Sequence, residues 1–146
     1  MSTPFRLMSL VVLVFFAGMG LVFSQEKLGE PLPDDLGTTV AREGGGFVNV
    51  RIVGGRFRVY FLDKDSKLIE PVYPIGIIRY AVKKEYNRKI TITLKALKGK
   101  PYLEAVRVIS PPYRYYIALI LTQNVDEPIP GLPEKETFSR ILVNQL

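Results

Sequence analysis

Apolar and polar side chains alternate strictly along several short segments, and this pattern constrains the fold more than any other feature of the chain. The clearest run is Ile90-Thr91-Ile92-Thr93-Leu94-Lys95-Ala96, in which every second residue is apolar. A period of two places the apolar side chains on one face of an extended strand, whereas a helix needs a period near 3.6. Valine and isoleucine also greatly outnumber alanine after residue 24, which favours pleated sheet. The chain is therefore predicted to be all-β.

A β-hairpin is predicted around Gly54-Gly55. Two consecutive glycines suit the two-residue turns that join antiparallel strands, because these turns need positive φ angles. Alternating apolar residues flank the glycines, namely Val48, Val50 and Ile52 before them and Phe57, Val59 and Phe61 after them. We therefore expect Val59 to be buried, and likewise Ile92 in the later run.

Further strands are predicted at roughly even spacing along the chain. They cover residues 77–83, 90–96, 102–109 and 113–121, with polar turns at 63–67, 84–88 and 98–101 and one short strand at Thr38–Ala41. The segment with Pro71 and Pro74 is either an edge strand or a connecting loop. About seven short antiparallel strands predict an immunoglobulin-like or transthyretin-like β-sandwich, preceded by the helix of an N-terminal signal peptide.

The length of 146 residues suits one compact domain with flanking segments. We predict a signal peptide at 1–24, a flexible acidic and glycine-rich lead at 25–45, a β-sandwich domain at 46–123, and a proline-rich tail at 124–146. The end of that tail is open to two interpretations. Phe138, Ile141 and Leu142 have the spacing of a helix turn, whereas Ile141-Leu142-Val143 would serve as a last strand.

The N-terminal segment has the pattern of an export signal. Arg6 is the only charged residue before Glu26, and residues 7–23 carry no charge. This arrangement is typical of a signal peptide, with cleavage expected between Ser24 and Gln25. The alternative is an uncleaved membrane anchor at residues 7–23. Both place the domain outside the cytoplasm, and the absence of cysteine favours the periplasm or envelope of a bacterium over a disulfide-stabilised secreted protein.

The composition excludes most catalytic and metal-binding chemistry. Histidine and cysteine are absent, and the three methionines all precede the predicted cleavage site. Soft metal ions select those side chains, so no metal site and no cofactor is predicted. Asp63 and Asp65 have the first spacing of a calcium loop, but Lys67 stands where a third oxygen ligand belongs, so a hairpin turn is expected there.

Two arrangements that do not need histidine also fall short of an active site. Ser66-Lys67 could form a Ser–Lys pair, but neighbours on an exposed turn point apart. The carboxylate pairs Asp34-Asp35 and Asp126-Glu127 lie on the predicted flanks, whereas glycoside cleavage needs two rigidly separated groups. We therefore predict that the protein is not an enzyme.

Basic and aromatic residues alternate along the predicted strands and form a candidate binding surface. Its members are Arg56, Arg58, Tyr60, Arg79, Lys89, Lys95, Arg114 and Tyr116. If they share one sheet face, that face is either an ordinary solvated surface or a site for an anion or a partner. Such a pattern also suits single-stranded nucleic acid, but export argues against that ligand.

Two functions are therefore carried forward. The first is a binding module that interacts with another envelope protein through an exposed strand edge or the C-terminal segment. The second is electrostatic binding of anionic envelope polymers or lipids through the basic sheet face. Membrane contact in the first case involves only the N-terminal segment, if that segment is retained.

Several pieces of the chain between Gly46 and Gln123 carry a resemblance. They are Gly55-Arg56-Phe57-Arg58-Val59-Tyr60-Phe61 with the Asp63-Lys64-Asp65-Ser66-Lys67 turn, the strand at 90–97, and Val108-Ile109-Ser110-Pro111-Pro112-Tyr113. In this order they resemble small exported β-sandwich domain proteins of bacteria. The resemblance implies an immunoglobulin-like fold and brings no activity with it.

Overall fold

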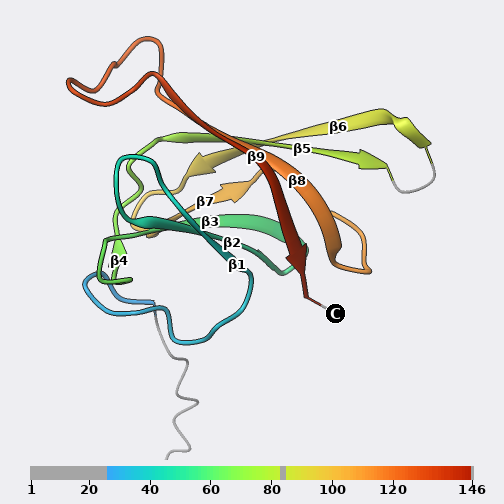
Figure 1. The fold of residues 1–146 in the computed structure, drawn as a ribbon, viewed down its shortest axis with the longest axis horizontal. Helices are drawn as coiled ribbons and strands as arrows, with labels where there is room; N and C mark the ends of the chain where they lie inside the picture. Colours follow the sequence, from blue (N-terminus) through green and yellow to red (C-terminus); the bar gives the residue numbers. More distant parts are fainter. Residues whose placement is uncertain (1–25, 83–84, 146) are drawn as a thin grey trace, which may run out of the picture.

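The computed structural model describes residues 26–82 and 85–145, and this part of the chain is built from antiparallel β-strands (Figure 1). The strands are β1 (Thr38–Ala41), β2 (Phe47–Val53), β3 (Arg56–Leu62), β4 (Leu68–Ile69), β5 (Ile75–Val82), β6 (Glu85–Ala96), β7 (Tyr102–Ala105), β8 (Arg114–Thr122) and β9 (Lys135–Asn144). The all-β prediction is confirmed. No helix able to span a membrane occurs in the described ranges, and the predicted signal peptide at 1–24 lies outside them.

The strands hydrogen-bond in the order β1-β2-β3-β7-β6-β5-β8-β9, with β4 beside β3. The predicted hairpin is confirmed, because β2 and β3 pair around Gly54 and Gly55, whose φ angles are 58° and 75°. Positive φ at both central residues matches the right-handed twist of the strands that the turn joins.

The sheet curls so that its two halves face each other across one core. Figure 1 shows β5 and β6 above β2, β3 and β7, with β8 and β9 running from that upper layer down to the level of β1 and β2. Phe57 on β3 contacts rings from the opposite half, with its centroid 6.3 Å from that of Tyr80 and 5.8 Å from that of Tyr115. Val59 and Ile92 are 0% and 1% exposed, as predicted. Tyr115 also shares the inward face of β8 with Ile117.

The two end strands of this path approach each other, which makes the sheet nearly barrel-shaped. The Thr38 hydroxyl on β1 donates to the Leu142 carbonyl on β9. Arg42, directly after β1, forms an ion pair of 3.1 Å with Glu136 on β9. Side chains, rather than a regular backbone ladder, therefore close this side of the sheet.

Two strand boundaries differ from the sequence predictions. The turn predicted at 84–88 is wrong from Glu85 onward, because β6 begins there. The β5-β6 hairpin projects beyond the other strands (Figure 1), so its polar residues meet solvent and need no apolar alternation. The strand predicted at 102–109 ends at Ala105, since the chain then leaves the sheet and the Ile109 N–H donates to the Gly55 carbonyl at 2.7 Å.

The structure decides between the interpretations left open for two segments. Leu68–Ile69 forms a two-residue strand beside β3, and the proline-bearing residues that follow form a loop. The C-terminal segment is a strand, β9, with Phe138, Ile141 and Val143 buried. A register shift opposite Ile117 and Leu119 accounts for the spacing of three between Phe138 and Ile141, which resembles a helix turn in the sequence.

Candidate functional site

The eight residues of the predicted surface all occupy outward positions on the sheet, but the curl divides them into two groups. Arg56, Arg58 and Tyr60 alternate with buried Phe57 and Val59 on β3. The other five lie on β5, β6 and β8, in the opposite half of the sheet: Arg79, Lys89, Lys95, Arg114 and Tyr116. The sequence pattern predicted the parity of these residues, and the fold places them on opposite halves of the sheet, which meet where Glu104 on β7 lies between Arg58 and Lys95.

Arg56 and Arg58 on β3 are engaged with other parts of the protein. Arg58 Nε lies 2.7 Å from Glu104 Oε2 on β7, and its guanidinium stands 4.2 Å from the ring centroid of Tyr102. Arg56 Nη1 donates to the Ala105 carbonyl at 3.0 Å. Their charges therefore help to hold β3 and β7 together and are only partly available to a ligand.

Tyr60 is buried beneath residues 26–37, which cover the outward face of β2 and β3. The Tyr60 hydroxyl donates to Glu26 Oε1 at 2.6 Å, and burial together with this hydrogen bond raises the pKa of Tyr60 far above its ordinary value. Leu32 packs against the cluster of Tyr60, Leu62 and Tyr102. Tyr60 is thus an interior residue rather than part of an open surface.

The same covering segment neutralises a buried arginine. Arg51 is 2% exposed, and its Nη1 lies 2.7 Å from Asp34 Oδ1. Its Nε donates to Asn49 Oδ1 at 2.9 Å, while Asn49 Nδ2 donates to the Leu36 carbonyl at 3.1 Å. The carboxylate of Asp34, which the sequence placed in a predicted flexible lead, therefore balances a charge on β2.

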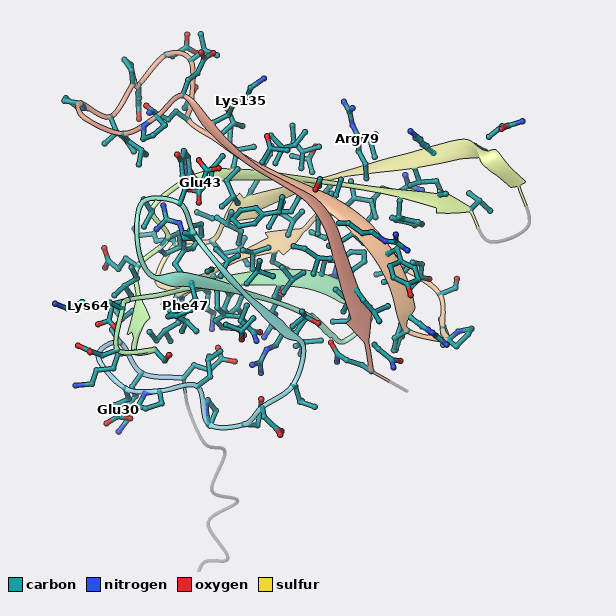
Figure 2. The ribbon with its side chains drawn as sticks, viewed as in Figure 1. Glu30, Glu43, Phe47, Lys64, Arg79 and Lys135 are labelled. Carbon is teal, nitrogen blue, oxygen red and sulfur yellow. The ribbon has the colours of Figure 1, made fainter. Side chains whose placement is uncertain are left out.

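The second group forms a surface that we call the cationic face. It comprises Tyr116 and the outward cations of β5, β8, β9 and residues 89–95 of β6. These cations are Arg79, Lys89, Lys95, Arg114, Lys135 and Arg140. Figure 2 shows Arg79 and Lys135 projecting from the same side of the molecule, away from Glu30 and Lys64. Sequence reasoning found the first four cations and missed the two on β9.

No outward position of these segments carries a carboxylate. The only acidic residue on them, Glu136, lies opposite inward-facing Leu121 and pairs with Arg42. The ion pairs among the described residues are Arg42–Glu136, Arg51–Asp34 and Arg58–Glu104, and none of them uses a cation of this face. Glu104 on β7 lies beside Lys95 but pairs with Arg58, so the cationic face keeps most of its charge for solvent or a ligand.

The cations of this face are spaced apart by neutral residues. Across the strands, Lys95 lies beside Ile75, Ile75 beside Thr122, and Thr122 beside Lys135. Three strand spacings separate the two lysines by about 14 Å at the backbone. Arg79 lies between Thr91 and Ala118, and Arg140 stands 4.6 Å from the ring centroid of Tyr116. This spacing suits an extended array of anions better than one small anion.

A separate cleft of about 540 Å³ lies between the loops at one end of the sheet. Apolar side chains at its rim are about half exposed, namely Leu28, Leu97 and Ile129. Its charged lining residues are Glu26, Glu70 and Lys100, and Glu26 is already bonded to Tyr60. The cleft is therefore a mostly apolar hollow whose charged groups do not converge on one ligand chemistry.

The acidic turn residues have a structural role. Asp63 Oδ1 accepts hydrogen bonds from the N–H groups of Asp65 and Lys67, both at 2.9 Å, which fixes the turn between β3 and β4. The predicted turn is confirmed. Within residues 26–82 and 85–145, no group of three acidic side chains gathers in a way that could hold a metal ion.

A scan against protein-family models, a search of curated proteins and a search of solved structures each found no match to this chain.

Proposed function

We propose that the protein is a non-catalytic binding module whose cationic face holds a phosphate-rich polyanion, either an envelope polymer or the headgroups of an anionic lipid surface. One observation carries this proposal. Six cations occupy outward positions on β5, β8, β9 and residues 89–95 of β6, where no outward position carries a carboxylate. The carboxylate beside Lys95, that of Glu104 on β7, is paired with Arg58, and Arg42 and Arg51 elsewhere are likewise paired with carboxylates.

The spacing of the cations supports a polymeric or planar ligand. Neutral residues separate Lys95 from Lys135 and surround Arg79, so no single phosphate is enclosed by several donors. A surface of this kind attracts polyanions through its summed potential, with an affinity that falls steeply as salt is added. Ile75 and Ile77, which lie among the cations on β5, add aliphatic contact area for a lipid interface or a polymer backbone.

The disposition of the reactive side chains supports a non-catalytic role. The carboxylates of Asp34, Glu104 and Glu136 are engaged in ion pairs that join separate segments. Ser66 and Lys67 lie exposed on a turn that Asp63 stabilises. These groups serve the fold, and the cationic face needs none of them as an acid or base.

Export and the finer fold assignment belong to the same proposal. The uncharged segment at 7–23 supports export to a bacterial periplasm or envelope, where phosphate-rich polymers and lipids are abundant. The two facing halves of the sheet support an immunoglobulin-like or transthyretin-like sandwich of the kind found in small exported bacterial domains.

The test measures binding of the full chain to phosphatidylglycerol vesicles and to inorganic polyphosphate, with phosphatidylcholine vesicles as the neutral reference. Arg79, Arg114 and Arg140 are replaced together by Glu, and the matched control replaces Lys27, Lys64 and Lys67 by Glu. The two variants carry the same net charge. We expect the first to weaken binding at least tenfold and the control to weaken it less than threefold.

The outcomes distinguish the ligands. Binding to polyphosphate alone identifies a polymer, and binding to phosphatidylglycerol alone identifies a lipid surface. Equal losses in the two variants, or equal binding to phosphatidylcholine, would overturn the proposal. Arg56 and Arg58 are left unchanged because Arg58 pairs with Glu104, so reversing its charge would disturb the fold as well as any ligand.

A protein partner is the second candidate function. The observation that favours it is an open strand edge on β6, which lies on the projecting β5-β6 hairpin (Figure 1). An exposed edge of this kind is the structural requirement for binding an extended segment by strand addition.

A further inference from the structure

Part of β6 directs its backbone polar groups away from its hairpin partner. The Ala96 N–H donates to the Pro74 carbonyl at 3.2 Å, which marks this position of the ladder as a hydrogen-bonded one, although proline has no N–H to return the bond. In an antiparallel ladder such positions alternate with non-bonded ones. With the observed register, the residues at 90, 92 and 94 bond to β5, while Lys89, Thr91 and Thr93 point their N–H and C=O groups to the other edge.

The next strand covers only one end of that edge. β7 pairs with β6 from Leu94 to Ala96, and the Thr93 carbonyl accepts a hydrogen bond from the Val106 N–H at 3.1 Å. The chain then crosses to β3, where Ile109 bonds to Gly55. Among the described residues, no strand pairs with the edge of β6 at Lys89 and Thr91. Lys89 and Thr91 thus each leave one N–H and one C=O group without a strand partner at this edge.

The chemistry around this edge is cationic on one side and apolar on the other. Lys89 and Arg79 flank Thr91 on the outward face, and Arg107 is exposed on the segment that leaves β7. On the inward face, Ile90 of β6 and its neighbour Tyr80 of β5 are only partly buried. A strand added here would place alternate side chains near the cations of the outward face and near Ile90 and Tyr80 on the inward face.

We propose that the β6 edge at Lys89–Thr91 binds an extended acidic segment of another protein by antiparallel strand addition, in the position that a longer β7 would occupy. The partner alternates acidic and apolar side chains. A second copy of this chain fits poorly, because pairing of two β6 edges would bring cations such as Lys89 of both copies together. This site rests on the protein-partner candidate above; it shares Lys89 and Arg79 with the cationic face and differs from the polyanion proposal in using the backbone groups of β6.

The test uses a capped ten-residue peptide of alternating Glu and Val, with a Lys and Val peptide as the charge control, titrated into the full chain. We expect the acidic peptide to bind and to slow amide hydrogen exchange at Thr91 and Lys89. Thr91→Pro removes the edge N–H without removing a bond to β5, so it should weaken binding at least tenfold. Thr91→Ala keeps that N–H and should change binding less than threefold.

A second pair of variants covers the case in which Thr91→Pro does not fold. Lys89→Glu should weaken binding of the acidic peptide at least tenfold, whereas Lys98→Glu, on the turn between β6 and β7, should have less than a threefold effect. Absence of binding, equal binding of the basic peptide, or protection elsewhere than at Thr91 and Lys89 would overturn the proposal. If hydrogen exchange at Thr91 slows as the protein concentration rises in the absence of peptide, a second copy binds this edge, and the proposal of a different protein partner is overturned. Thr91→Pro keeps every cation, so its binding to phosphatidylglycerol vesicles tests the cationic face separately.

Discussion

The side-chain amide of Gln145 replaces a missing strand opposite Ile52. Its Oε1 accepts a hydrogen bond from the Ile52 N–H at 2.5 Å, and its Nε2 donates to the Ile52 carbonyl at 2.8 Å. β1 pairs with β2 only as far as Val50, so these two backbone groups of Ile52 would otherwise lack a ladder partner. Together with the Arg42–Glu136 pair, Gln145 links the last strand of the sheet to the first strands.

Gln145→Ala should lower the free energy of unfolding by about 1–3 kcal/mol, because it leaves a buried donor and acceptor without partners. Urea denaturation measures this change. Asn144→Ala, at the neighbouring exposed position, is the control and should stay within about 0.5 kcal/mol of the wild type. Equal stability of the two variants would show that Gln145 does not stabilise the contact between the last strand of the sheet and the first strands.

The ion pair between Arg51 and Asp34 predicts a larger effect. Arg51 is 2% exposed and its Nη2 has no hydrogen-bond partner. The carboxylate of Asp34 is therefore the main group that balances the buried charge of Arg51. Asp34→Ala should cost about 2 kcal/mol or more, since it strands a buried charge. Asp35→Ala next to it should have little effect on urea denaturation.

A second replacement identifies the cause of that loss. Arg51→Met in the Asp34→Ala background removes the unpaired charge and keeps an apolar stem of similar length. It should recover much of the stability, because buried ion pairs are often replaceable by apolar side chains. If the double variant is as unstable as Asp34→Ala, the loss comes from the loop and not from the charge on Arg51.

The sequence predicted local structure better than it predicted which charges are free. Alternation on β3 correctly placed Arg58 and Tyr60 on the outward face. However, Arg58 pairs with Glu104, 46 residues away along the chain, and Tyr60 bonds to Glu26, 34 residues away. Period-two patterns say which face a side chain occupies, and they do not say which distant segment covers that face.

On β9, by contrast, the sequence pattern missed cations that have no carboxylate partner among the described residues. Lys135 and Arg140 extend the cationic face, but the register shift opposite Ile117 and Leu119 interrupts the alternation of the strand. A bulge shifts the parity by one residue, so the apolar spacing resembled a helix turn and the outward cations were not recognised. Treating the segment as two short alternating runs that meet between residues 139 and 140 would have found both.

The glycine run between β1 and β2 allows a matched test of backbone strain. Gly46 has a φ of 75°, and a Cβ there would lie 2.3 Å from the Leu62 carbonyl oxygen, whereas a Cβ at Gly44 would meet nothing within 4 Å. Gly46→Ala should therefore lower the free energy of unfolding by about 2 kcal/mol or more. Gly44→Ala should change it by less than about 0.5 kcal/mol. Similar values for the two would indicate that residues 44–46 act only as a linker.

Tyr60 predicts how stability depends on alkaline pH. Burial and the hydrogen bond to Glu26 raise the pKa of Tyr60 in the folded protein, whereas the unfolded chain titrates near the ordinary tyrosine value of about 10. Above that pH the unfolded state gives up a proton that the folded state keeps, so the free energy of unfolding falls as pH rises. The stability that this phenol contributes is complete below pH of about 10 and is lost progressively above it.

Tyr60→Phe removes this group and should make the alkaline loss shallower by up to about 1.4 kcal/mol per pH unit, although it weakens the protein at neutral pH by losing the bond to Glu26. Urea denaturation between pH 8 and 11 measures both effects. Glu26→Gln keeps the phenol but removes the carboxylate charge that raises its pKa, so its alkaline loss should lie between those of the wild type and Tyr60→Phe. An unchanged alkaline slope in Tyr60→Phe would mean that this hydroxyl titrates in the folded protein as it does in the unfolded chain, and that residues 26–37 do not keep it from solvent.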